Sequence, residues 1–88
     1  MTKNEIKDLI VRTLKLSIRP EDISDGASLN ADIGLDSINA LELATALEEK
    51  YDLTIDDNEI YKILTSVDSI FEHVNLKTGG KSRVQIGL

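Results

Sequence analysis

Four helix-start signals divide this 88-residue chain, and they constrain its fold more than any other feature of the sequence. Each signal is a side chain that can cap free backbone N–H groups, with apolar residues at helical spacing after it. The predicted helices, each with its capping residue, cover about residues 3–16 after Thr2, 37–51 after Asp36, 56–64 from Asp56 and 66–77 after Thr65 or Ser66.

This pattern predicts an all-α fold, because neither a strand hairpin nor an internal repeat is apparent. Three of the predicted helices are longer and the one over 56–64 is short, so we expect a four-helix bundle. A chain of this length forms one small domain and is too short for a deeply enclosed active site. We expect the domain to cover residues 1–77 and a flexible C-terminal tail to cover 78–88.

The long connection over residues 17–35 lacks a regular hydrophobic period and contains Pro20, Gly26 and Gly34. A structureless segment of this length is unusual in a compact domain, so it indicates either a function or an element that the pattern does not reveal. Its apolar residues are expected to hold it against the bundle, and they are Ile18, Ile23, Leu29, Ile33 and Leu35.

Composition limits the core and the chemistry. Only Tyr51, Tyr61 and Phe71 are aromatic, so the core must be aliphatic. Cysteine is absent, which excludes disulfides, thiolate metal sites and a native thiol nucleophile. The N-terminus lacks the pattern of a signal peptide and no apolar run reaches membrane-spanning length, so we expect a cytoplasmic monomer that does not insert into membranes.

The distribution of charge along the chain is more informative about binding partners than the net charge of −6. Residues 21–72 hold 14 acidic and two basic residues, a net of −12, whereas residues 1–20 and 73–88 each carry +3. Such an acidic surface repels nucleic acid and anionic membranes, and it speeds encounter with basic patches on other proteins. The alternative is an acidic face that serves only solubility.

The predicted helix over 37–51 has two apolar faces. A stripe suited to the core consists of Ala40, Leu43, Ala44, Leu47 and Tyr51. A second set, Ile38, Leu41 and Thr45, is bordered by carboxylates at Glu42, Glu48 and Glu49. An apolar strip with an acidic border is typical of a docking surface. The alternative is that Ile38 and Leu41 simply pack beneath the 17–35 connection, and for Leu41 the periodicity favours neither.

Ser37 lies in the first turn of this helix, near the edge of the second face. A hydroxyl there is exposed, is held on a rigid element and lies among unpaired N–H groups that favour an anion such as a phosphodiester. A serine after an aspartate at a helix start is, however, more often an ordinary cap.

The ordered motifs resemble the acyl carrier protein family. Residues 32–38 read Asp-Ile-Gly-Leu-Asp-Ser-Ile, similar to that family's D-L-G-x-D-S-L attachment motif, and an acidic amphipathic helix ending at Tyr51 follows. The resemblance continues in the segments around Pro20, Ile55 and Thr65, so it covers about residues 3–77. The ordered set is specific, whereas an isolated Asp-Ser pair would be weak.

The resemblance implies that Ser37 accepts 4′-phosphopantetheine from coenzyme A. It also implies a separate phosphopantetheinyl transferase that uses Mg²⁺ and recognises Asp36. Acyl-handling synthases and transferases of fatty acid, lipid or polyketide biosynthesis would dock on the second face of the helix, formed by Ile38, Leu41, Glu42, Thr45, Glu48 and Glu49. The arm would supply the thiol that this cysteine-free chain lacks and would carry acyl groups as thioesters.

Several residues depart from the family pattern. Ile38 replaces the usual Leu, Asn39 replaces a common acidic residue, and Ile60 with Tyr61 makes the third helix bulkier and less acidic. The basic stretch from Lys77 to Leu88 is not a family signature. These departures favour a carrier dedicated to a modified fatty acid, lipid or polyketide pathway over one for housekeeping fatty-acid synthesis.

Three other carrier or binding functions remain open. A peptidyl carrier shares the bundle and the modified serine but usually has two glycines before the motif, where this chain has Gly34-Leu35. An aminoacyl carrier differs only in the cargo chosen by its loading enzyme. An unmodified helical interaction module would use the same acidic face without carrying cargo.

An enzyme or a specific metal site is not expected. A serine nucleophile needs a positioned base, and His73, the only histidine, is predicted to point to solvent from the fourth helix. The acidic residues near 52–59 lack the spacing of a calcium-binding EF-hand loop, so only weak divalent binding is expected there.

Overall fold

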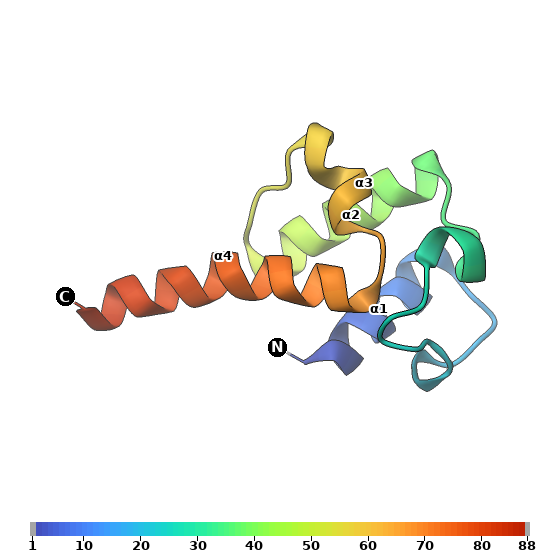
Figure 1. The fold of residues 1–88 in the computed structure, drawn as a ribbon, viewed down its shortest axis with the longest axis horizontal. Helices are drawn as coiled ribbons and strands as arrows, with labels where there is room; N and C mark the ends of the chain where they lie inside the picture. The colour runs from blue at the N-terminus through green and yellow to red at the C-terminus, as the bar shows by residue number, and fades with distance from the viewer. Residues whose placement is uncertain (1, 88) are drawn as a thin grey trace.

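The computed structural model describes residues 2–87, which contain helices and no strand. The three longer helices are α1 (Lys3–Leu14), α2 (Ser37–Tyr51) and α4 (Val67–Gly87), and α3 (Ile60–Ile63) is a single turn that contacts both α2 and α4. Helix α4 extends past the other helices at its C-terminal end (Figure 1). The predicted all-α bundle is confirmed. None of the described helices is both long and apolar enough to cross a lipid bilayer.

Helix α1 begins as its capping signal predicts. The Thr2 hydroxyl accepts a hydrogen bond from the Glu5 backbone N–H at 3.2 Å. The helix ends at Leu14, because Lys15 adopts a left-handed conformation with φ 54° and its N–H bonds to the Val11 carbonyl. Ile6 and Ile10 are fully buried, so α1 turns its periodic apolar stripe toward the bundle.

The buried core is aliphatic, as the shortage of aromatic residues predicts. Tyr51 and Phe71 are half-buried at its edge, and Tyr61 is exposed. The buried side chains come from all four helices and from the connections between them: Ile6, Ile10, Ile23, Leu29, Leu35, Ala40, Leu43, Ala44, Leu47, Ile55, Ile60, Ile63, Leu64, Val67, Ile70 and Val74.

The connection between α1 and α2 contains two short helices that the hydrophobic pattern did not reveal. They are a 3₁₀ turn, η1 (Pro20–Asp22), and a single-turn π-helix, η2 (Leu29–Ile33). Three of the five apolar residues are buried as expected and Ile33 is half-buried, but the prediction for Ile18 is wrong because this side chain is 42% exposed. Each helix is too short to show an apolar period.

The third and fourth helices differ from prediction at their ends. A 3₁₀ turn, η3 (Asp57–Glu59), precedes α3, and the Asp56 side chain makes no capping bond. The Ser66 hydroxyl, by contrast, accepts the Ser69 N–H at 3.1 Å and caps α4. The predicted end near Lys77 is wrong, since α4 continues to Gly87. No proline follows Pro20, so nothing in the sequence forces the helix to stop.

The division into a domain over 1–77 and a flexible tail over 78–88 stays a prediction, and residue 88 lies outside the described residues.

Candidate functional site

Two adjacent side chains at the start of α2 have different roles. Asp36 is the cap: its Oδ1 accepts the Asn39 N–H at 2.8 Å, and its carbonyl accepts the Ala40 N–H at 2.8 Å. Ser37 is the first helical residue and is exposed, and no hydrogen bond joins its hydroxyl to another described residue. The alternative in which Ser37 is an ordinary cap is therefore wrong, and its hydroxyl is accessible to solvent.

The residues before Ser37 are held in place by a network of backbone bonds. The Leu35 N–H donates to the Leu29 carbonyl at 3.0 Å, and the Asn30 side chain donates to the Leu35 carbonyl at 3.3 Å. Leu29 in turn donates its N–H to the Thr65 carbonyl at 3.0 Å, which ties η2 to the turn between α3 and α4. The residues that lead into Ser37 are thus fastened to the turn between α3 and α4.

The two apolar faces of α2 separate as predicted. Ala40, Leu43, Ala44 and Leu47 are buried. Tyr51 is half-buried, and burial, followed by the nearby Glu5 carboxylate, raises the pKa of its phenol to about 12.

The second face of α2 is open to solvent. Ile38 is 68% exposed and Leu41 is 52% exposed, so the alternative in which Leu41 packs beneath the connection is wrong. Thr45 is exposed, and its hydroxyl donates to the Leu41 carbonyl at 3.0 Å. Ile38, Leu41 and Thr45 thus form an unpartnered strip along the helix.

The three acidic residues at the border of this strip are placed differently. Glu42 and Glu49 are exposed. Glu48 is half-buried, and its Oε2 accepts the Ile55 N–H at 2.8 Å. This bond joins residues seven positions apart and fastens the segment after α2. One of the predicted docking carboxylates thus already has a structural partner.

The sequence indicates that Tyr61 makes the third helix bulkier, but it does not predict that this side chain is exposed beside α2. Tyr61 is 63% exposed on α3, next to α2. Its exposure could have been predicted from the spacing of its neighbours. Ile60 and Ile63, three residues apart in a helix of one turn, take the buried side and leave Tyr61 on the other. An aromatic side chain with an apolar ring and a polar tip is a frequent anchor in protein interfaces.

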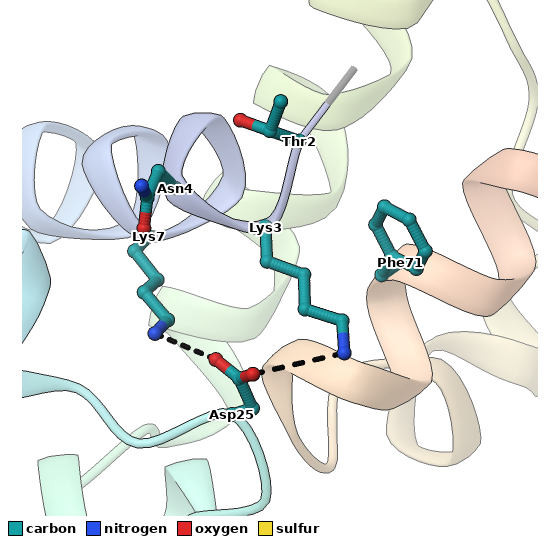
Figure 2. Close-up of a pocket in the computed structure, with 6 residues that line it drawn as sticks. All are labelled: Thr2, Lys3, Asn4, Lys7, Asp25 and Phe71. Carbon is teal, nitrogen blue, oxygen red and sulfur yellow. Dashed lines mark ion pairs between the residues drawn. The ribbon is translucent and has the colours of Figure 1, made fainter.

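An open cavity of about 490 Å³ lies at the N-terminal end of α1, and it contains none of the predicted site residues. Figure 2 shows the charged side chains that meet there. Its lining residues are Thr2, Lys3, Asn4, Lys7, Asp25 and Phe71.

Comparison with known proteins decides the family. The model of a family described as a phosphopantetheine attachment site matches residues 4–74. The acyl carrier protein of Wolinella succinogenes is 36% identical to the chain over 67 residues, which is 76% of this chain and 86% of that relative. The chain belongs to the acyl carrier protein family. Members of this family are carriers rather than catalysts, and their cofactor is phosphopantetheine.

The single histidine of this acyl carrier protein is not where the sequence predicted. His73 is half-buried rather than pointing to solvent, and its Nε2 is buried without a hydrogen-bond partner among the described residues. Burial lowers the pKa of His73 below its ordinary value of 6.5; the Lys77 ammonium lowers it further and Glu59 opposes both. No hydrogen bond joins this imidazole to Ser37, so His73 is not positioned as its base.

Within the part of the chain that the structure describes, no group of three or more histidine, aspartate or glutamate side chains is arranged to hold a metal ion.

Proposed function

We propose that Ser37 carries 4′-phosphopantetheine and that the chain shuttles acyl groups, as thioesters on that arm, between partner enzymes. The observation that carries this proposal is the exposed Ser37 hydroxyl in the first turn of α2, with Asp36 performing the capping task beside it. A capping serine would have its oxygen engaged, whereas this oxygen is accessible to a transferase.

The surroundings of Ser37 fit a phosphodiester. The N–H groups of Ser37 and Ile38 have no partner within the helix, and the helix dipole favours an anion there by about 0.3–1 kcal/mol at an exposed site. Ser37 itself is exposed, so an arm attached to its oxygen can extend into solvent. The arm, when bound, supplies the thiol for thioester chemistry, which no residue of this cysteine-free chain provides.

These local effects do not catalyse the modification. Asp36, the residue directly before Ser37, carries a carboxylate that repels a phosphate group and so opposes the dipole's attraction. We therefore assign catalysis to a separate phosphopantetheinyl transferase, for which Asp36 and the first turn of α2 serve as the recognition site. In the transfer, Ser37 Oγ bonds to the phosphorus that carries the phosphopantetheine as the pyrophosphate P–O bond of coenzyme A breaks. The nucleotide part of coenzyme A leaves, and the hydroxyl proton passes to a base supplied by the transferase.

The exposed face of α2 is the proposed docking surface for the transferase and for acyl-handling enzymes. Ile38 and Leu41 contribute apolar area at its centre, and Glu42 and Glu49 orient a basic partner at its border. Glu48 adds charge at the edge, although its carboxylate also holds the Ile55 N–H. Tyr61 offers a further exposed ring on α3, the helix that contacts α2.

The modification is tested by intact mass. We expect the protein, incubated with coenzyme A, Mg²⁺ and a broad-specificity phosphopantetheinyl transferase, to gain the mass of one phosphopantetheine. Ser37→Ala should gain nothing, because the acceptor oxygen is gone. Ser17→Ala, which removes another exposed serine hydroxyl, is the matched control and should be modified like the unaltered protein. An unaltered protein that stays unmodified would favour the interaction module.

The cargo is tested on the modified protein. Intact mass after incubation with acyl-loading or aminoacyl-loading enzymes distinguishes an acyl carrier from an aminoacyl or peptidyl carrier. We expect acyl groups to be loaded and amino acids to be refused.

A further inference from the structure

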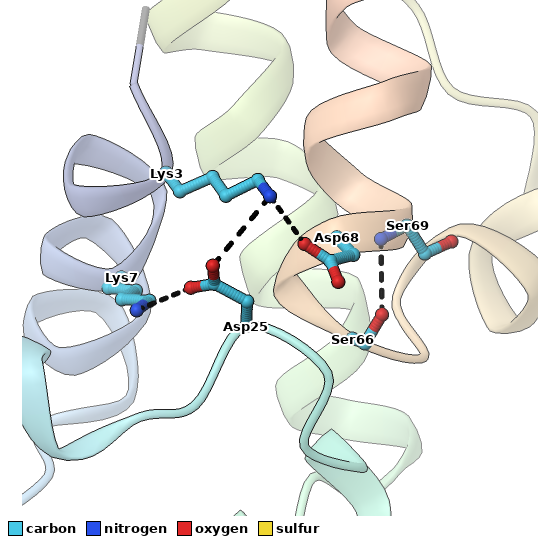
Figure 3. Close-up of polar contacts among 6 residues, drawn as sticks. All are labelled: Lys3, Lys7, Asp25, Ser66, Asp68 and Ser69. Carbon is cyan, nitrogen blue, oxygen red and sulfur yellow. Dashed lines mark hydrogen bonds and ion pairs between the residues drawn. The ribbon is translucent and has the colours of Figure 1, made fainter.

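A charged cluster joins three parts of the chain on the side of α1 and α4 (Figure 3). The Asp25 carboxylate lies between two ammonium groups: Lys7 Nζ is 2.6 Å from its Oδ1 and Lys3 Nζ is 3.6 Å from its Oδ2. Lys3 Nζ also lies 2.8 Å from Asp68 Oδ1, in the first turn of α4. The cluster therefore links α1, the segment between η1 and η2, and α4.

Lys7 is the least exposed residue of this cluster. Its side chain is only 11% exposed, so most of its stem is packed against the protein and its ammonium is held at Asp25 rather than free to move in solvent. Among the described residues, Asp25 is the carboxylate within ion-pair distance of Lys7. The hydrogen bond from Lys7 is also the main reason why the pKa of Asp25 lies below its ordinary value of 3.8.

The backbone of Asp25 is held as well. Its carbonyl accepts the Asp68 N–H at 3.0 Å. Four residues later Leu29 donates to the Thr65 carbonyl, and Leu35 donates back to the Leu29 carbonyl, both at 3.0 Å. Leu35 is followed directly by the capping residue Asp36 and by Ser37. A continuous set of bonds thus runs from the charged cluster to the start of α2.

We propose that Asp25 is a positioning residue for the attachment site: its ion pairs with Lys3 and Lys7 hold residues 25–35 in the arrangement that presents Ser37 to the transferase. This inference rests on the proposed function of Ser37. When the pairs are removed, the transferase must order this segment as it binds, so the effect appears in the apparent affinity rather than in the chemical step.

The first test measures amide hydrogen exchange of the apo protein. In Asp25→Asn we expect the Leu29 and Leu35 amides to exchange about threefold to tenfold faster, the size expected for partly exposed charge pairs. The Leu43 and Ile10 amides, inside helices, should be unchanged. Asp8→Asn is the matched control, because it removes the same charge from an ion pair that lies wholly within α1, with Arg12 at 3.0 Å.

The second test measures transfer kinetics with the same transferase and coenzyme A. We expect Asp25→Asn to raise the KM for the protein substrate by about threefold to tenfold, with kcat unchanged. Asp8→Asn should leave both constants unchanged. Combining Lys7→Met with Asp25→Asn should raise KM no further than the larger single effect, because both changes remove the same pair.

The outcomes separate this inference from the proposed function. If the unaltered protein is never modified, the proposed function fails and the positioning role fails with it. If it is modified but Asp25→Asn leaves KM and the Leu29 and Leu35 amides unchanged, only the positioning role fails. Faster exchange at Ile10 and Leu43 as well, a fall in kcat alone, or additive effects of Lys7→Met and Asp25→Asn would also overturn it.

Discussion

At the scale of single residues, the half-buried imidazole of His73 has the most direct consequence for stability. Its Nε2 is buried without a hydrogen-bond partner among the described residues, and burial lowers its pKa below 6.5. The folded protein therefore binds a proton on His73 less readily than the unfolded chain does. The stabilising effect of the neutral imidazole is complete above the pKa of His73 in the unfolded chain. It is lost as the pH falls through the lower pKa of His73 in the folded protein.

We test this contribution with His73→Gln, which is polar and has no charge at any pH. The unaltered protein should lose stability relative to His73→Gln between about pH 7.5 and about pH 5, the range in which histidine gains its proton. The measurement is the free energy of unfolding from urea titrations at several pH values. The comparison cancels the relief of carboxylate repulsion that acidification brings to both proteins. A difference that stays constant over this range would contradict the assignment.

At the scale of elements, the single-turn helix η2 determines how the chain enters α2. The Ser28 hydroxyl begins η2 by accepting the Ala31 N–H at 3.2 Å. Gly34 ends it in a left-handed conformation with φ 80°, and its N–H bonds to the carbonyls of Asn30 and Leu29. The turn at Gly34 brings the chain to Leu35, which is buried, and then to Ser37, which is exposed.

Gly34→Ala should destabilise the protein by about 1–2 kcal/mol, the cost of a left-handed conformation for a residue with a side chain. The effect comes from the backbone alone, because a side-chain carbon there would meet nothing within 4 Å. The measurement is the urea midpoint at constant m-value. Gly26→Ala is the control, since its added carbon would meet only Asp68 Oδ2, at 4.0 Å, and it should be nearly neutral. Equal losses in both variants would refute this account.

At the scale of the whole molecule, the basic N-terminal segment forms ion pairs with only part of the acidic middle of the chain. Lys3 and Lys7, from the basic N-terminal segment, neutralise Asp25 and Asp68 of the acidic middle. No lysine or arginine lies within 4.0 Å of the Glu42 or Glu49 carboxylate among the described residues, and this is the face proposed for partners. Residues 36–64, which include α2 and α3, hold eight acidic and two basic residues, a net of −6.

This imbalance predicts that the apo protein melts at a lower temperature at low ionic strength, and that millimolar Mg²⁺ or Ca²⁺ raises its Tm. Salt also weakens the Lys3 and Lys7 pairs, but these few contacts are outweighed by the excess of acidic residues. Each 1 kcal/mol of relieved repulsion should raise the Tm by about 4–8 °C in a domain of this size. Calorimetry across salt and divalent concentrations measures this shift, and a constant Tm would refute the idea of a strained acidic surface.

The sequence by itself determined the starts of α1, α2 and α4, the aliphatic core and the two faces of α2. Caps and apolar periods act over a few residues, so Thr2, Asp36 and Ser66 are recognisable without any knowledge of distant neighbours. The family also followed from the order of short motifs along the chain, and the family match covers residues 4–74.

Only the tertiary structure decided that Leu41 is exposed, that Glu48 holds the Ile55 N–H, that His73 is half-buried and that Asp25 pairs with Lys3 and Lys7. It also decided that α4 passes Lys77. Each of these facts except the last depends on contacts between residues far apart in the sequence. Hydrophobic periodicity does not predict such contacts. The end of α4 escaped prediction because a helix without a following proline has only weak stop signals.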